Sequence, residues 1–345
     1  MLALTLSALG GPDQLVLRDD LPPPTLDSPH AVLVRLEAAA LNHLDLYVLA
    51  GLPGVTIRPP WIVGSDGAGI VEAVGSAVTG VRPGDRVVVN PGTSCGACEY
   101  CADGEQPLCP RYRIYGEHLP GFLTEAIVVP ERNVLAVPPS VGPEQAAAFT
   151  LATLTAWRMV VGRAQVRPGD QVLVWGIGGG VALAALQIAK RIGATVWVTS
   201  GSPAKLARAR ALGADHVLDH RTQDVPRVIR EATGKRGVDV VIDSVGEATW
   251  ARSLQALGRR GRLVTCGGTS GPKVETDVRR LFWNQWTLMG STMGNDAEFA
   301  AIVGELRAGR LLPPIDSVWP LAQGRQAYER LASGEQFGKV VVRIG

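Results

Sequence analysis

The sequence predicts an α/β protein with two domains, one mostly β and one built on a doubly wound parallel sheet. Its length of 345 residues suits about two domains. Up to about Pro139 the chain is dense in Val, Gly and Pro, and runs such as 31–36 and 85–89 have the composition of short strands between turns. From Asp170 onward, apolar strands alternate with helical stretches, which is typical of a parallel sheet covered on both faces.

The elements can be placed in order along the chain. The first domain is expected to be compact and mostly antiparallel, and a helical connector from Pro143 to about Val161 follows it. In the second domain we expect strands at 171–175, 195–199, 216–218, 238–243, 262–266 and 286–290, with helices at 181–191, 203–212, 224–233 and 247–257. The last stretch, of roughly fifty residues, is short for a domain, so we expect it to return to the first one.

Composition and charge exclude several classes of partner. The net charge is +2 at pH 7, and there is no basic run or interleaved aromatic platform, so we do not expect a nucleic acid partner. No apolar stretch reaches the ~20 residues that span a bilayer. The apolar residues 1–9 lack the charged start and the cleavage site of a signal peptide and are expected to form a first strand. We therefore expect a cytoplasmic protein without a membrane partner.

Four of the five cysteines fall within one short stretch, three of them at a spacing of three. Zinc binds four thiolates at ~2.3 Å in a tetrahedron and so holds a small loop-rich segment together. A [4Fe–4S] cluster is disfavoured because its usual run has three residues before the fourth cysteine, whereas this chain has seven. Disulfides are disfavoured without a secretory signal, and free thiols remain the plain alternative. We expect one structural zinc, held by Cys95, Cys98, Cys101 and Cys109.

The first strand of the parallel sheet is followed by a glycine-rich loop that opens the next helix. Glycines in this position let the backbone turn tightly and approach a pyrophosphate, which then lies at the helix N-terminus. A plain tight turn between strand and helix is the alternative. The third glycine of the dinucleotide fingerprint is replaced by Val181 or Ala182, depending on register. The residues expected to bind the cofactor are Gly176, Gly178, Gly179, Gly180 and Val181.

The end of the second strand favours NADP over NAD. NAD-binding domains place a carboxylate about 20 residues after the glycine loop, where it binds the ribose. No acidic residue lies between Thr195 and Lys205, so a 2′-phosphate is not repelled. Ser200 and Ser202 can donate hydrogen bonds to it, and Lys205 can supply charge. The alternatives are NAD as cofactor and an ordinary solvated role for Lys205.

With these motifs, the chain resembles the medium-chain dehydrogenase/reductase superfamily over nearly its full length. Further motifs that carry the resemblance are Gly64-x-Asp-Gly-x-Gly-Ile-Val-Glu-x-Val-Gly75, Val81-x-Pro-Gly-Asp-Arg-Val87 and Phe337-Gly-Lys339. The resemblance implies a GroES-like catalytic domain (1–149 and 293–345) with a zinc lobe at about 91–112. It also implies a Rossmann domain at 150–292, and a homodimer or homotetramer paired near residues 286–290.

The resemblance does not extend to the catalytic zinc of the alcohol dehydrogenases in this superfamily. Where these enzymes have Cys-His-Thr-Asp, this chain has Asn42-His43-Leu44-Asp45. Their Gly-His-Glu is matched by Gly64-Ser65-Asp66, and their third ligand by Leu151. Asn, Ser and Leu cannot replace Cys, His and Cys around zinc. A different metal site that uses His43 and Asp66 is the alternative.

The segment from Asn42 to Tyr47 is instead similar to zinc-independent quinone oxidoreductases of the same superfamily, which have Asn, Asp and Tyr at these spacings. Tyr47 is the expected donor to a developing oxyanion, because its phenol stays protonated near neutral pH. The Asn42 amide can donate to the same oxygen, or it can instead hold its own loop in place by hydrogen bonds. His43 matches a position that contacts the cofactor pyrophosphate and can relay protons, or it is a surface histidine. Asp45 is expected to cap the following helix.

Together these features predict an NAD(P)H-dependent reductase of quinones or conjugated carbonyls. The nicotinamide carries the hydride, and a conjugated substrate spreads the charge that zinc would otherwise stabilise. The second hypothesis is an alcohol or aldehyde dehydrogenase in which a proton relay replaces the zinc. The third is a regulator that binds NADPH without turnover.

Overall fold

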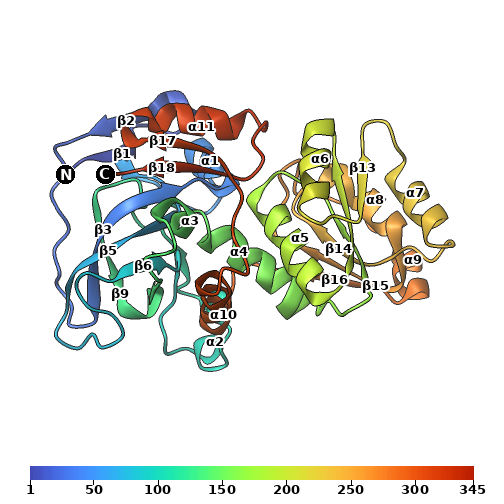
Figure 1. The fold of residues 1–345 in the computed structure, drawn as a ribbon, viewed down its shortest axis with the longest axis horizontal. Coiled ribbons are helices and arrows are strands. Elements are labelled where there is room, and N and C mark those ends of the chain that lie inside the picture. Colours follow the sequence, from blue (N-terminus) through green and yellow to red (C-terminus); the bar gives the residue numbers. More distant parts are fainter. The chain divides into compact units, whose positions relative to one another are not determined.

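The computed structural model describes residues 1–345, which divide into two compact units. The first unit comprises Met1–Ala152 and Gly294–Gly345, and the second comprises Thr153–Met293. Figure 1 shows the mixed β architecture of the first unit and the layered α/β architecture of the second. No helix of the chain combines the length and the apolar character that a membrane crossing requires.

The first unit is built on a seven-stranded sheet in the order β10-β6-β5-β3-β18-β17, with β9 also paired to β3. All its strand pairs are antiparallel except β17 with β18. A three-stranded sheet, β2-β1-β4, and a small β7-β8 pair complete the unit. The strands are β1 Ala3–Leu6, β2 Leu15–Arg18, β3 Ala31–Ala40, β4 Trp61–Ile62, β5 Asp66–Val74, β6 Arg86–Val89, β7 Gly92–Thr93, β8 Arg113–Ile114, β9 Ala126–Pro130, β10 Val134–Ala136, β17 Ile315–Pro320 and β18 Lys339–Arg343.

The C-terminal segment closes the sheet of the first unit. Strand β18 pairs with β3 in the register Val341–Ala40, and the N–H of Leu41 donates to the carbonyl of Val340. The first residue of β18 therefore lies beside the end of β3, where the next helix begins. The helices of this unit are α1 His43–Ala50, α2 Glu99–Ala102, α3 Pro143–Ala147, α10 Asp296–Arg307 and α11 Gly324–Ala332.

The second unit is a parallel six-stranded sheet in the order β13-β12-β11-β14-β15-β16. Its central strands β11, β12 and β14 are almost entirely buried, as a sheet covered on both faces requires. Helices α5 and α6 pack on β11 to β13, and α8 and α9 on β14 and β15 (Figure 1). The elements are β11 Gln171–Val174, α5 Gly180–Ile192, β12 Thr195–Ser200, α6 Pro203–Ala211, β13 His216–Asp219, α7 Val225–Ala232, β14 Val238–Asp243, α8 Glu247–Ala256, β15 Leu257–Thr265, α9 Val278–Asn284 and β16 Thr287–Gly290.

The structure confirms the predicted fold class and corrects two elements. The connector expected as one helix is divided into α3, α4 Thr150–Trp157 and a π-helix, Arg158–Arg163. Helix α4 begins at Thr150 because the Asp66 carboxylate accepts the N–H of Leu151 in its first turn. Strand β15 begins at Leu257, earlier than the expected 262, and Arg260 within it takes a positive φ of 58°.

Candidate active site and metal centre

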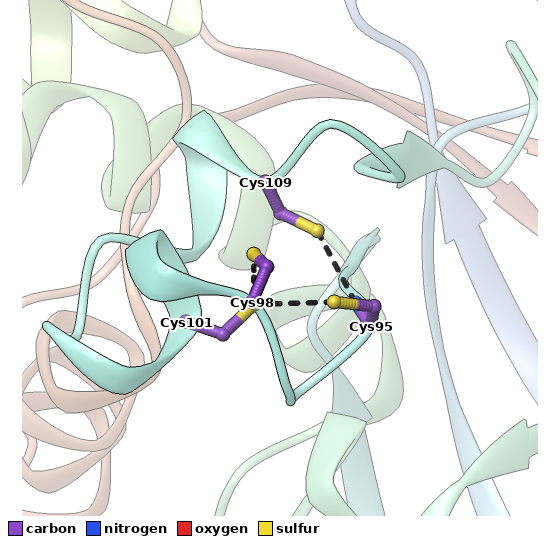
Figure 2. A group of neighbouring side chains, drawn as sticks. All are labelled: Cys95, Cys98, Cys101 and Cys109. Carbon is purple, nitrogen blue, oxygen red and sulfur yellow. Dashed lines mark hydrogen bonds between the residues drawn. The ribbon is translucent and has the colours of Figure 1, made fainter.

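The structure brings the four clustered cysteines together. Their sulfur atoms all lie within 4.8 Å of one another, and the side chains point toward one another (Figure 2). The Sγ of Cys101 lies 3.9 Å from that of Cys95 and 3.5 Å from that of Cys98. A tetrahedral zinc with bonds of ~2.3 Å places its sulfur ligands ~3.8 Å apart. The cluster therefore has the dimensions and the ligand chemistry of a zinc site.

The backbone of the lobe prepares these thiols for a cation. The N–H groups of Ala97 and Arg111 each donate to a sulfur at 3.4 Å, the first to Cys95 and the second to Cys109. The hydrogen bond from Ala97 lowers the pKa of Cys95 to about 5. The thiolate of Cys95 in turn raises the pKa of the Arg111 side chain. The neighbouring sulfurs raise the pKa of Cys98 to about 11, so without a metal the lobe favours the thiolate at Cys95 and the thiol at Cys98.

Helix α1 carries two of the predicted catalytic side chains. The rings of His43 and Tyr47 meet edge to face, with their centroids 4.9 Å apart. Burial raises the pKa of Tyr47 and lowers that of His43, which favours the neutral form of both rings near neutral pH. The Tyr47 hydroxyl is shielded from solvent and has no hydrogen-bond partner. A buried hydroxyl without a partner costs about 1–3 kcal/mol, so this oxygen is suited to bind a ligand.

The carboxylate of Asp66 is fully buried and accepts four hydrogen bonds. Its Oδ1 accepts the Thr150 hydroxyl at 2.5 Å and the Leu151 N–H at 2.8 Å. Its Oδ2 accepts the Asn42 amide and the Lys339 ammonium, both at 2.9 Å. Lys339 also donates to Oδ1 of Asn42 at 2.5 Å. The predicted catalytic Asn42 is thus part of a buried ion-pair network.

A second carboxylate lies next to this ion pair. As expected, Asp45 caps α1, because its Oδ2 accepts the backbone N–H of Asn42 at 2.6 Å. Its Oδ1 accepts the Ser65 hydroxyl at 2.8 Å. Burial raises the pKa of Asp45 to about 7, against the opposing charge of Lys339. The Tyr328 hydroxyl on α11 is buried without a partner, and burial and the charge of Asp45 raise its pKa.

The positions that the resemblance matches to catalytic zinc ligands do converge, but they do not offer zinc ligands. The Asn42 amide donates to the Ser65 hydroxyl at 3.4 Å. It also donates to the Asp66 carboxylate, which accepts the backbone N–H of Leu151 as well. An amide, a hydroxyl and an alkyl side chain do not fit a zinc ion. The cysteine cluster is the only group of three or more His, Cys, Asp or Glu ligands in the chain.

The glycine-rich loop lies between β11 and α5 and has the conformation that its glycines permit. Gly176 has φ of 69° and Gly178 has φ of 138°, a region that other residues rarely adopt. A side-chain carbon added at Gly179 would meet no atom within 4 Å, so the backbone there is open to a ligand. Gly180 and Val181 form the first turn of α5. Open backbone at a helix N-terminus suits a pyrophosphate.

The two serines predicted to bind the 2′-phosphate each accept a hydrogen bond from a backbone N–H group. Ser200 ends β12, and its hydroxyl oxygen accepts the N–H of Ser202 at 3.1 Å. Ser202 caps α6, because its hydroxyl oxygen accepts the N–H of Lys205 at 3.4 Å. Both hydroxyl hydrogens remain able to donate outward.

Sequence reasoning missed one cation at this edge of the sheet. A side-chain carbon at Gly201 would collide with Nε of Arg221, so this guanidinium lies against the end of β12. The loop that carries it is fixed by the Asp219 carboxylate, which accepts the Arg221 N–H at 2.9 Å, and by a bond from the His220 N–H to the Ser200 carbonyl. The only signal in the sequence was the glycine itself, and it does not say which side chain requires it.

Two protein-family models match the chain. Residues 28–139 match the alcohol dehydrogenase GroES-like domain, and residues 180–308 match the zinc-binding dehydrogenase model. The chain is 33% identical over 344 residues to a zinc-type alcohol dehydrogenase-like protein of Schizosaccharomyces pombe, covering 97% of both chains. It is also 33% identical to a quinone oxidoreductase of Pseudomonas aeruginosa, again over 97% of both chains. A solved NAD-dependent alcohol dehydrogenase superposes with a TM-score of 0.96 at 43% identity, covering 100% of both chains.

Proposed function

We propose that this chain, which belongs to the zinc-type medium-chain dehydrogenase/reductase superfamily, reduces quinones or conjugated carbonyls by hydride transfer from NADPH. That the chain is an NAD(P)-dependent oxidoreductase follows from its relatives, which are named alcohol dehydrogenase and quinone oxidoreductase. The observation that carries the finer proposal is the buried pair of Lys339 and Asp66, which contacts two of the positions matched to the catalytic zinc ligands, Asn42 and Leu151.

The choice of substrate follows from where negative charge develops. Hydride addition to an isolated carbonyl leaves a full charge on one oxygen, which a Lewis-acidic metal stabilises by several kcal/mol. Hydride addition to a quinone or an enone gives a phenolate or enolate that spreads the charge over the conjugated system. A site with hydrogen-bond donors and no zinc ligands therefore favours conjugated substrates.

We assign the donor role to Tyr47. When bound, the nicotinamide supplies the hydride. The Tyr47 hydroxyl, buried and without a partner, donates a hydrogen bond to the substrate oxygen. Reduction consumes one hydride and one proton, and the reduced, anionic product takes up the proton from solvent. His43 orients the Tyr47 ring by its edge contact. The Asn42 amide is engaged by Asp66 and Lys339, so we assign it to the network and not to the substrate oxygen.

Alcohol oxidation is the second candidate. The solved structure with 43% identity is named an NAD-dependent alcohol dehydrogenase, and this favours it. The unpartnered Tyr47 hydroxyl beside the neutral His43 ring could then pass the alcohol proton outward. The two functions differ in the substrate that turns over fastest.

We propose NADP as the preferred cofactor. Strand β12 ends in Ser200 where NAD-binding domains have an acid. The Arg221 guanidinium against Gly201, the two serine hydroxyls and Lys205 form a polar, basic edge around that point. Arginine binds phosphate in a bidentate way. These features favour a 2′-phosphate over the free ribose hydroxyl.

We further propose one structural zinc per chain, held by the cysteine cluster. The lobe between β7 and β8 contains only the four-residue helix α2 and a short 3-10 turn at Gln106–Leu108. Such a lobe is too small to form a hydrophobic core of its own, and a bound metal ion can hold it together instead. The four thiols need a reducing compartment to stay available, so we place the protein in the cytoplasm.

The surface of the second unit suits a second copy of the chain. Strand β16 is an edge of the parallel sheet. Beside it in the chain, α9 exposes Val278 at 65%, Phe282 at 63% and Trp283 at 73%. An open strand edge next to large exposed apolar side chains is the kind of surface that pairs. We propose a homodimer through β16 and α9, with a homotetramer as the larger assembly.

The proposed activity is tested by steady-state rates with a quinone, an enone and a primary alcohol. We expect the quinone and the enone to turn over faster than the alcohol. Tyr47→Phe should lower kcat by about 10²-fold, the usual cost of one oxyanion donor, and leave the dissociation constant for NADPH unchanged. Tyr100→Phe, on the zinc lobe, is the control and should not change kcat. Faster turnover of the alcohol would favour the second candidate.

The cofactor preference is tested by replacing the cation at the β12 edge. Arg221→Gln should raise KM for NADPH by about 10-fold and leave KM for NADH unchanged, since one bidentate contact is worth at least 1.4 kcal/mol. Arg227→Gln, on the exposed face of α7, is the matched control. A wild-type enzyme that prefers NADH would contradict the proposal.

The metal content is tested by elemental analysis of purified protein. We expect one zinc per chain. Cys101→Ser should abolish binding and lower the melting temperature, because the lobe loses the ion that replaces its core. Cys266→Ser, at the only cysteine outside the cluster, should keep the zinc. A second ion per chain that Asn42→Ala removes would show a metal in the active site.

The oligomeric state is tested by light scattering. The wild-type chain should have the mass of a dimer or tetramer, and Trp283→Ser combined with Phe282→Ser should shift it toward the monomer. Leu108→Ser, which removes an equally exposed side chain from the zinc lobe, should leave the mass unchanged. A wild-type monomer at all concentrations would rule out the interface.

A further inference from the structure

The buried ammonium of Lys339 is the one fully enclosed lysine charge of the chain. Its side chain is 3% exposed and pairs with Asp66, which is 0% exposed. A second lysine pair with a carboxylate, Lys190 with Asp215, is about one-third exposed at both ends. A buried charge is costly unless it is paired and hydrogen-bonded. The location of Lys339 therefore calls for a role that a surface pair does not have.

The ion pair joins segments that are distant in sequence. Lys339 opens β18, and Asp66 opens β5. Between them the Asn42 amide accepts from Lys339 and donates to Asp66. Asn42 is the N-cap residue of α1, so its position determines where α1 starts. Tyr47 lies on α1, one turn after His43. Through Asn42, the ammonium can set the position of the tyrosine.

The charges around α1 also depend on this one ammonium. Two buried carboxylates, Asp45 and Asp66, share the network with it. Without Lys339 these two buried carboxylates would have no cation in their network. Titratable groups face Asp45 from three other elements, namely Asp66 on β5, Lys339 on β18 and Tyr328 on α11. Among these, only Lys339 is a cation.

We propose that Lys339 is the fixed cation of the active site and a positioning residue for Tyr47. Its hydrogen bonds to Asn42 and Asp66 hold the start of α1, as coordination bonds hold ligands around a metal. This inference rests on the proposed function for its kinetic consequence. Its structural consequence, an α1 that depends on Lys339, is independent of the substrate.

The first test uses hydrogen–deuterium exchange on the full chain, without substrate. Lys339→Met should increase exchange in α1 (residues 43–50) by about 10-fold or more. Lys190→Met, which removes the lysine of the exposed pair, is the matched control and should leave α1 unchanged. Unaltered exchange in α1 of Lys339→Met would overturn the proposal, whatever the enzyme reduces.

The second test separates positioning from stability. The double variant Asp66→Asn with Lys339→Met removes both charges and leaves no unpaired ion, so it should recover most of the melting temperature that Lys339→Met loses. We expect its kcat to stay at least 10-fold below the wild-type value, with KM for NADPH unchanged. Full recovery of kcat together with stability would mean that Lys339 is only structural.

A pH profile completes the test. In the wild-type enzyme, Lys339 favours the ionised Asp45 that caps α1. Its removal makes the proton harder to lose, so the acidic limb of the kcat profile should move to higher pH in Lys339→Met. A limb that does not move, or that moves to lower pH, would contradict the role of this charge.

Discussion

The hydrogen bonds that converge on the Asp66 carboxylate constrain the first unit more than any other interaction. A fully buried carboxylate must be satisfied, and here the donors come from the β3–α1 junction, from α4 and from β18. The C-terminal strand β18 enters the sheet next to β3, and this brings Lys339 to the carboxylate. The Asp66 carboxylate therefore links the position of the C-terminal strand β18 to the start of α1.

The same unit has one buried lysine cation and one cluster of four cysteines that could hold a metal cation. The cysteine lobe is an excursion between two-residue strands, and it contains little that could form a core. A metal ion would be an effective crosslink there, because the four cysteine sulfurs converge on one point. The network around Asp66 lies instead against a seven-stranded sheet with a large apolar core. In that place a lysine side chain is long enough to bring a positive charge to the carboxylate from a neighbouring strand.

What the sequence could predict was local. The parallel strands, the glycine-rich loop and the four cysteines each depend on residues that are close in sequence, and their patterns are specific. The contact of Lys339 with Asp66 spans 273 residues, so no local pattern contains it. The contact of Arg221 with Gly201 is also not local, because Arg221 lies in the loop that follows the next strand, β13. The division of the connector helix at Thr150 also depends on a distant side chain, because Asp66 binds the amide that starts the new helix.

These contacts also limit the chemistry. A metal ion with an open coordination position binds the substrate oxygen directly, whereas the Lys339 ammonium already donates to Asn42 and Asp66 inside the protein. It fixes its neighbours and keeps its charge balanced by a carboxylate, so little of that charge is left to stabilise an oxyanion. The remaining donor is a phenol whose pKa burial raises, and such a donor gives a hydrogen bond more readily than a proton. In the function that we propose, the substrate therefore delocalises most of the charge itself, and this links the buried ion pair to the proposed conjugated acceptor.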